Sequence, residues 1–179
     1  TVPEGMQLRQ AGIQLPILKF NPMFAEEMLP ALENDITFTV CETANIAALQ
    51  ALCAAEHRTA RVHLKVDTGM GRIGVPVAEA PGMAAFIEKN CPNLFLEGIF
   101  THLPVSDDRD PAYTRQQIQR FQDVVEAIRA AIGRRVDLVH CANSGGVLGH
   151  EPGWLDMVRP GIMIGGFYPD PGTPRTMPP

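Results

Sequence analysis

Short apolar segments alternate along the chain with longer segments whose apolar residues recur at helical spacing. The apolar segments predict six strands, at 16–20, 37–40, 61–66, 96–102, 137–142 and 157–165. The segments between them predict helices at 23–32, 44–55, 78–89 and 111–132, with one short helical turn at 144–148. Strands that alternate with helices in this way lie parallel and are joined by right-handed crossovers, which leaves a doubly wound sheet or a TIM-type barrel. Because no GxGxxG turn follows the first strands, a dinucleotide-binding fold is disfavoured.

The helix at 111–132 has the clearest pattern. Asp110 and Pro111 predict its cap and its first residue, and Gly133 predicts its end. Its apolar positions share one face: Ile118, Phe121, Val125, Ile128 and Ile132. We therefore expect this helix to lie on the sheet with that face inward.

Both ends of the chain are predicted to be cut. Residues 4–12 have the pattern of the last part of an amphipathic helix, with Leu8 facing inward and Gly12 as the C-terminal stop. Residues 168–179 contain too many prolines for regular structure and predict a linker. We expect the chain to begin inside one element and to lead into another part of a longer protein.

Composition narrows the function classes. With 179 residues, 45% of them hydrophobic, the chain can bury the core of one domain. A net charge of −5 with scattered basic residues argues against a nucleic-acid surface. Its cysteines have neither metal-ligand nor disulfide spacing, so no metal site is expected and free thiols favour the cytoplasm: Cys41, Cys53, Cys91 and Cys141. The sequence shows no leader pattern or membrane-length apolar run, so we expect neither secretion nor membrane insertion.

The segment 62–75 is the most informative part of the chain, because an apolar strand runs directly into a glycine-rich loop. It carries Lys65, Asp67 and Arg72 within eight residues. Burying such charges close together is costly unless they pair. Two interpretations follow: a site built at the end of a strand, or a loop tied by a bridge between Asp67 and Arg72.

Polar residues also follow the next strands, at the end where βα barrels build their sites. They are Thr101 and His102, then His140, Asn143 and Ser144, then Arg159. A lone histidine such as His102 is more often a packing or capping residue, and Asn143 could be an ordinary N-cap. Loops at 141–146 and 158–162 would be adjacent after the last two strands, where such barrels hold phosphate, so a phosphorylated ligand or cofactor is favoured.

Four segments, in this order and spacing, closely resemble the barrel domain of alanine racemases: 63–74, 100–103 with 106–108, 140–144 and 157–162. Residues 4–13 and 16–18 also resemble that family's second helix and third strand. The family consists of fold-type III enzymes that depend on pyridoxal 5'-phosphate. The resemblance implies an incomplete TIM (β/α)8-type barrel over 1–169, with about six of eight strands present, and a proline-rich linker at 170–179 toward a C-terminal β domain.

The resemblance also implies a role for each of five cofactor-side residues. Asn143 and Ser144 match the first phosphate loop, and Gly161 with Ile162 matches the second. Arg159 matches the arginine that hydrogen-bonds the pyridine nitrogen of the cofactor. Because arginine stays charged, it would leave that nitrogen unprotonated and limit side reactions such as transamination.

Three further residues match the catalytic support of the family. Arg72 matches the arginine near the phenolic oxygen of the cofactor, and His102 matches the histidine beside its ring. Lys65 matches a lysine that is often carbamylated, and a carbamate there would be an anion able to hold Arg72. After the last barrel strand this chain has Gly165 and Gly166 where the family commonly has Tyr-Gly.

The implied reaction is the interconversion of L-alanine and D-alanine by two bases. In the family these are a lysine that ends the first strand and carries the Schiff base, and a tyrosine from the C-terminal domain of the partner subunit of a homodimer. No residue here matches either base: the lysines are Lys19, Lys65 and Lys89, and the tyrosines are Tyr113 and Tyr168. We therefore expect a fragment that is inactive alone. Two alternatives remain: a racemase of serine or another amino acid, and a non-catalytic PLP-binding or interaction module.

Overall fold

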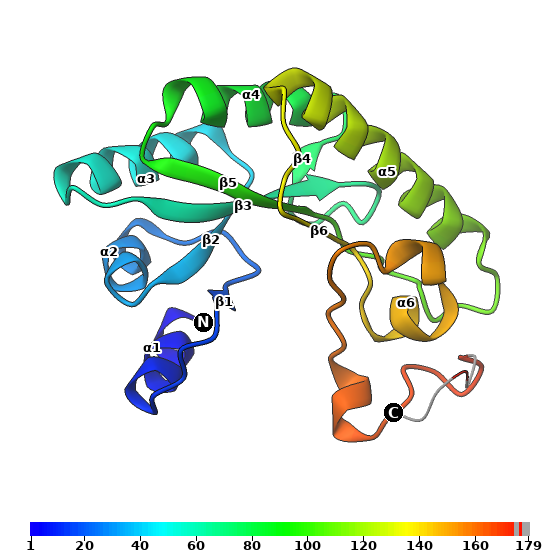
Figure 1. Ribbon diagram of the computed structural model, residues 1–179. Coiled ribbons are helices and arrows are strands. Elements are labelled where there is room, and N and C mark those ends of the chain that lie inside the picture. The colour runs from blue at the N-terminus through cyan, green and yellow to red at the C-terminus, as the bar shows by residue number, and fades with distance from the viewer. Residues whose placement is uncertain (174–175, 177–179) are drawn as a thin grey trace.

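The computed structural model describes residues 1–173 and 176 (Figure 1). The strands are β1 (Ile17–Leu18), β2 (Ile36–Val40), β3 (Ala60–Asp67), β4 (Val75–Pro76), β5 (Leu94–Phe100) and β6 (Leu138–His140). The helices are α1 (Val2–Gln10), α2 (Ala25–Glu33), α3 (Thr43–Ala55), α4 (Ala80–Asn90), α5 (Ala112–Ile132) and α6 (Ser144–Gly149). Two 3-10 turns, η1 (Glu151–Gly153) and η2 (Ile162–Gly165), follow α6. Every predicted helix is present.

The strands form one parallel sheet in the order β1-β2-β3-β5-β6, and the two-residue β4 pairs with the end of β3. Figure 1 shows this sheet curled, with α3, α4 and α5 over its outer side and an open inner side facing the ends of the chain. This curled parallel sheet confirms the prediction of an incomplete βα barrel and rules out the doubly wound alternative.

The strand predicted at 157–165 is wrong. Within the described residues, this segment has no strand, and its second half forms η2. Its backbone donors bind the loops beside β6 instead of a strand ladder: Arg159 N–H donates to the Ala142 carbonyl at 2.8 Å, and Gly161 N–H donates to Ser144 Oγ at 2.9 Å. Pro160, which lacks an N–H, also prevents a continuous ladder. Conversely, β4 carries no sequence signal beyond its position after Gly74.

The two faces of β3 have different neighbours. Val62, Leu64 and Val66 belong to the main hydrophobic core under the helices. His63 and Lys65 alternate with them and therefore lie on the inner side of the sheet, where both are buried. The predicted inward face of α5 is confirmed, because Ile118, Phe121, Val125 and Ile128 are all buried in the same core, with Ile132 packed against it. The core thus fixes the sheet, and the inner side is left for polar residues.

The glycine stops predicted for two helices are confirmed, whereas the predictions that Leu8 faces inward and that Pro111 is the first residue of its helix are wrong. Gly12 lies at φ +85° just after α1, and Gly133 at φ +72° ends α5, as a glycine stop requires. Leu8 is 46% exposed, because α1 turns Val2 and Gly5 inward instead. Asp110 accepts a hydrogen bond from the Ala112 N–H at 2.9 Å, so Pro111 precedes the helix and is not its first residue.

The chain end is described only at 170–173 and 176. Half of the linker predicted at 170–179, namely 174–175 and 177–179, therefore lies outside the described residues. Thr176 donates a hydrogen bond to the Leu148 carbonyl at 2.8 Å, so this residue contacts α6. No helix in the described ranges combines the length and hydropathy that a membrane span needs.

Replacing Phe121 by alanine tests the core. Phe121 is fully buried between α5 and the sheet, so Phe121→Ala should lower the free energy of unfolding by about 3–5 kcal/mol. Phe24→Ala removes the same atoms from a side chain that is 73% exposed and should cost about 0.5 kcal/mol or less. Urea unfolding followed by circular dichroism measures both, and equal losses would contradict this packing.

Candidate active site

Three aligned residues form the floor of the site on the inner side of the sheet. Lys65 of β3 pairs in register with Phe100 of β5, and Phe100 pairs with His140 of β6. The Phe100 and His140 rings are stacked, with centroids 4.9 Å apart and planes within 4°. Because all three lie near the carboxyl ends of parallel strands, this edge corresponds to the site edge of a βα barrel.

Arg159 reaches this floor from the loop before η2. Its Nη1 donates to His140 Nδ1 at 2.7 Å, and its Nη2 donates to the carbonyls of Thr101 at 2.9 Å and Cys141 at 3.1 Å. Its guanidinium also lies 5.5 Å from the Phe100 ring centroid. Burial lowers the pKa of Arg159 to about 10, which still leaves it charged at neutral pH. The structure therefore holds one cation rigidly at the centre of the site.

Sequence reasoning did not single out two polar residues that lie behind Arg159: His63 and Glu97. His140 Nε2 lies 2.9 Å from His63 Nδ1, and His63 Nε2 lies 3.1 Å from Glu97 Oε2. His63 and His140 fall inside the segments that resemble the racemases, and their adjacency depends on the β3–β5–β6 pairing. Glu97 gave no signal in the sequence, because an isolated glutamate in a strand predicts only an exposed position.

Lys65 is a buried lysine among cations. Lys65 is only 4% exposed, and its Nζ lies 5.4 Å from the Phe100 ring centroid. Burial, followed by the charges of Arg72 and Arg159, lowers the pKa of Lys65. The site therefore disfavours the charged ammonium of Lys65 relative to a lysine in water.

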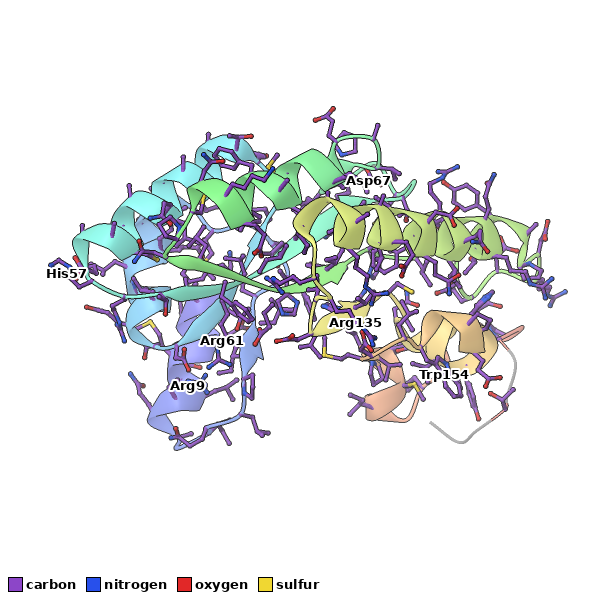
Figure 2. All side chains as sticks on the ribbon, turned by 45° about the horizontal axis from the view of Figure 1, so that its top comes forward. Arg9, His57, Arg61, Asp67, Arg135 and Trp154 are labelled. Atoms are coloured by element: carbon purple, nitrogen blue, oxygen red, sulfur yellow. The ribbon has the colours of Figure 1, made fainter. Side chains whose placement is uncertain are left out.

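The loop after β3 is organised by Asp67 and not by a bridge to Arg72. Asp67 Oδ1 accepts hydrogen bonds from the N–H groups of Gly69 and Met70, both at 2.9 Å, and Oδ2 accepts from Gly71 at 2.9 Å. The Asp67–Arg72 bridge considered from the sequence is thus wrong, since the carboxylate is used within the loop. Figure 2 shows Asp67 at the opposite end of β3 from Arg61, where the chain turns into this loop.

The same loop is fixed from outside by α5. Tyr113 Oη donates to the Gly69 carbonyl at 2.7 Å, and Arg120 Nη1 donates to the Thr68 carbonyl at 2.8 Å. Gly74 lies at φ +142°, and a Cβ there would come within 2.6 Å of the Asp67 nitrogen. Only glycine fits this close return of the chain onto β3, which sets the position of Arg72.

His102 lies two residues after the end of β5, in the same cationic field. Burial, followed by the charges of Arg159, Arg72 and Lys65, lowers the pKa of His102 to about 4. Its imidazole is therefore neutral at pH 7. The structure thus brings together four of the residues predicted from the sequence: Lys65, Arg72, His102 and Arg159.

The two predicted phosphate loops lie side by side. Asn143 is the N-cap of α6: its Oδ1 accepts from the Gly146 N–H at 3.1 Å and from Ser106 Oγ at 2.6 Å. The ordinary N-cap interpretation is therefore correct for its carbonyl oxygen. Ser144 Oγ accepts from Gly161 N–H and connects the two loops. The adjacent Ile162 N–H has no acceptor among residues 1–173 and 176.

Neither of two other residues that could act as bases is free. Lys19 Nζ donates to Glu27 Oε2 at 3.0 Å and to the Pro22 carbonyl at 3.1 Å, and Tyr113 is bound to the loop after β3. In the described part of the chain, no group of three or more His, Cys, Asp and Glu residues could hold a metal ion.

The curled parallel sheet and the cationic edge at its strand ends define a βα-barrel protein. Residues 1–169 match the family described as alanine racemase, N-terminal domain, so the chain belongs to that family.

Named relatives agree with this family. An alanine racemase of Cutibacterium acnes is 39% identical over 176 residues, which are 98% of this chain and 46% of the relative. One of Desulfovibrio desulfuricans is 40% identical over 171 residues, which are 96% of this chain and 46% of the relative. The chain therefore spans less than half the length of the curated relatives it matches.

Solved structures share the fold. The alanine racemase of Clostridium difficile in complex with cycloserine has a TM-score of 0.92 at 31% identity, covering 96% of this chain and 47% of that one. The alanine racemase of Bacillus anthracis with bound L-Ala-P has a TM-score of 0.85 at 31% identity, covering 94% of this chain and 43% of that one.

Replacing Asp67 by alanine tests how the loop is held. Asp67→Ala leaves the N–H groups of Gly69, Met70 and Gly71 without their acceptor, so their amide exchange should accelerate roughly tenfold. Asp137→Ala, at an exposed position before β6, is the matched control and should leave these amides unchanged. Hydrogen-exchange mass spectrometry on the peptide that contains 67–74 measures both. Protection that survives in Asp67→Ala would contradict the assignment.

Proposed function

We propose that the full-length protein interconverts L-alanine and D-alanine with pyridoxal 5'-phosphate, and that this chain supplies the cofactor-supporting part of the barrel. The observation that carries the proposal is the Arg159 guanidinium, fixed on His140 at 2.7 Å at the site edge of a fold shared with alanine racemases. Cycloserine and L-Ala-P, which are bound in two of those structures, are consistent with an alanine-sized substrate.

The donors present suit this cofactor. Its pyridine nitrogen accepts a hydrogen bond, and Arg159 keeps its Nε–H and one Nη1–H without an acceptor among the described residues. Its phosphate needs N–H and hydroxyl donors, and the adjoining loops offer the Ile162 N–H beside Ser144 and Gly161. We therefore assign Arg159 to the ring nitrogen, and Ser144, Gly161 and Ile162 to the phosphate.

Asn143 has a supporting role in this proposal. Its side chain caps α6 and binds Ser106, and Asn143 Nδ2 donates to the Leu103 carbonyl at 2.9 Å. These contacts hold the start of α6, and with it Ser144, in place. Asn143 thus belongs to the first phosphate loop as its structural anchor.

When bound, pyridoxal phosphate stabilises negative charge at the substrate Cα after its proton leaves. Arg159 tunes that chemistry, because a guanidinium donates a hydrogen bond to the ring nitrogen without giving up its proton. Neutral His102 supports the ring without adding charge, and Arg72 supplies the cation near the phenolic oxygen. These residues bind and orient; the two bases come from parts of the full-length protein outside 1–179.

The assembly and location follow from the same proposal. The two bases in the family come from the first barrel strand and from a partner subunit, so we infer a homodimer. The four free, buried cysteines support a cytoplasmic location, where thiols stay reduced.

Reversing the charge of Arg159 tests the assignment. Arg159→Glu in the full-length protein should lower kcat/KM for alanine racemisation about 100-fold or more, since it removes the donor and adds a carboxylate acceptor. Arg135→Glu makes the same change at an exposed residue before β6 and should leave turnover within about twofold. The circular dichroism of the alanine solution follows the conversion of one enantiomer into the other and gives the rate. Unchanged turnover of Arg159→Glu would remove Arg159 from the mechanism.

Carbamylation of Lys65 gives a second test. The lowered pKa of Lys65 raises the fraction of neutral amine, whose lone pair attacks carbon dioxide, releases one proton and leaves a carbamate anion. Full-length protein in ¹³C-bicarbonate should show a carbamate carbon resonance that is absent in Lys65→Met. Lys89→Met, at an exposed lysine, should keep it. A wild-type spectrum without that resonance would contradict the carbamate.

A further inference from the structure

Four side chains form a continuous hydrogen-bonded row that begins at Arg159 in the site and ends at Glu97 of β5. The two between them are His140 and His63. Arg159 Nη1 lies 2.7 Å from His140 Nδ1, His140 Nε2 lies 2.9 Å from His63 Nδ1, and His63 Nε2 lies 3.1 Å from Glu97 Oε2. The residues come from three adjacent strands and the loop before η2. His63 and His140 are both fully or nearly fully buried, so no solvent separates the links.

The chemistry of the two ends sets the direction of every proton in this row. Arg159 can only donate, so His140 Nδ1 must accept and His140 carries its proton on Nε2. His140 Nε2 then donates to His63 Nδ1, and His63 carries its proton on Nε2, where Glu97 accepts it. A doubly protonated His63 would place two donors against each other further along the row. Burial lowers the pKa of both imidazoles, which agrees with two neutral rings.

The backbone around this row is shaped to hold it. The pairing of β3 with β5 shifts by one residue after Val62, which leaves Glu97 as the extra residue of a bulge. A bulge re-aims the side chain that it carries, here toward His63. At the next residue, Gly98, a Cβ would come within 2.4 Å of the His63 ring, so only glycine leaves room for the imidazole. The His140 ring is fixed by stacking on Phe100.

Among the described residues, the ionisable side chains that pair with Glu97 are Arg61 and His63. Arg61 of β3 faces it, with Nη1 3.5 Å from Glu97 Oε1, and Arg61 is itself half exposed and also 3.9 Å from Asp35. Glu97 therefore holds one oxygen toward the half-exposed Arg61 and the other toward buried His63. The negative end of the row is a partly buried carboxylate, 15% exposed, whose charge is screened little by water.

We propose that Glu97 is a positioning residue for Arg159: through His63 and His140 it fixes the acceptor that holds the guanidinium, and it supplies the negative charge that compensates this buried cation. The inference rests on the proposed function only in assigning Arg159 to the cofactor. It predicts that a change at Glu97 alters how Arg159 is held at the other end of the row.

The proton directions are tested in the unaltered full-length protein, without added cofactor. In ¹⁵N-histidine-labelled protein, protonated and unprotonated ring nitrogens differ in chemical shift, and His63→Gln and His140→Gln spectra assign the signals. We expect His63 and His140 to carry their protons on Nε2 and to be neutral at pH 7. A proton on Nδ1 of either ring, or a doubly protonated His63, would overturn the inference whatever the activity.

Variants at Glu97 test the coupling. Glu97→Met removes the acceptor and the charge, and should shift the His140 Nδ1 resonance, weaken pyridoxal phosphate binding in equilibrium dialysis, and lower kcat about tenfold with KM for alanine within about twofold. Glu97→Gln restores an acceptor without charge and should recover part of each loss. Glu126→Met is the matched control, because Glu126 is exposed and pairs with Arg129 within α5, away from this row.

The two proposals fail separately. If Glu97→Met or, should that variant not fold, Glu97→Gln leaves the His140 signal, the cofactor affinity and kcat as in the wild type, Glu97 is not a positioning residue, while racemisation stands. If the wild-type protein binds the cofactor but does not racemise alanine, the proposed function fails, and the NMR and dialysis results still decide the role of Glu97. A change in KM for alanine with kcat unchanged in Glu97→Met would also overturn the inference.

Discussion

The arrangement of this site depends on keeping the guanidinium of Arg159 charged and immobile in a poorly solvated place. Three acceptors do this: His140 Nδ1 and the carbonyls of Thr101 and Cys141. The two carbonyls are within reach of Arg159 because the chain leaves β5 and β6 at the same level. The imidazole is within reach because His140 points to the inner side of the sheet. The electrostatic character of the whole edge follows, since the same cation helps to keep His102 neutral and to lower the pKa of Lys65.

Backbone irregularities place the chemistry. The bulge at Glu97 and the missing side chain at Gly98 place a carboxylate and an imidazole together inside the sheet, because a Cβ at Gly98 would meet the His63 ring. The return of the chain at Gly74 has a similar role, because it brings the loop that carries Arg72 back against β3. The outer faces of the same strands are ordinary apolar packing, so stability and chemistry occupy opposite sides of one sheet.

Much of this could be predicted from the sequence, because helical periodicity and apolar segments depend on local spacing. The face of α5, the strand β3 and the glycine stops Gly12 and Gly133 follow from such spacing. The missing strand at 157–165, the loop role of Asp67 and the contact of Glu97 with His63 depend instead on where backbone donors find acceptors in three dimensions. Spacing alone could place Asp67 near Arg72, but it could not show that three nearer N–H groups would take its carboxylate.

A crystal structure of the full-length protein with pyridoxal 5'-phosphate tests the central claim most directly. The account predicts that Arg159 donates a hydrogen bond to the pyridine nitrogen while keeping its contact with His140, and that the phosphate lies against Ser144, Gly161 and Ile162. A pyridine nitrogen that faces a carboxylate, or an Arg159 that turns away from His140 to another partner, would contradict it.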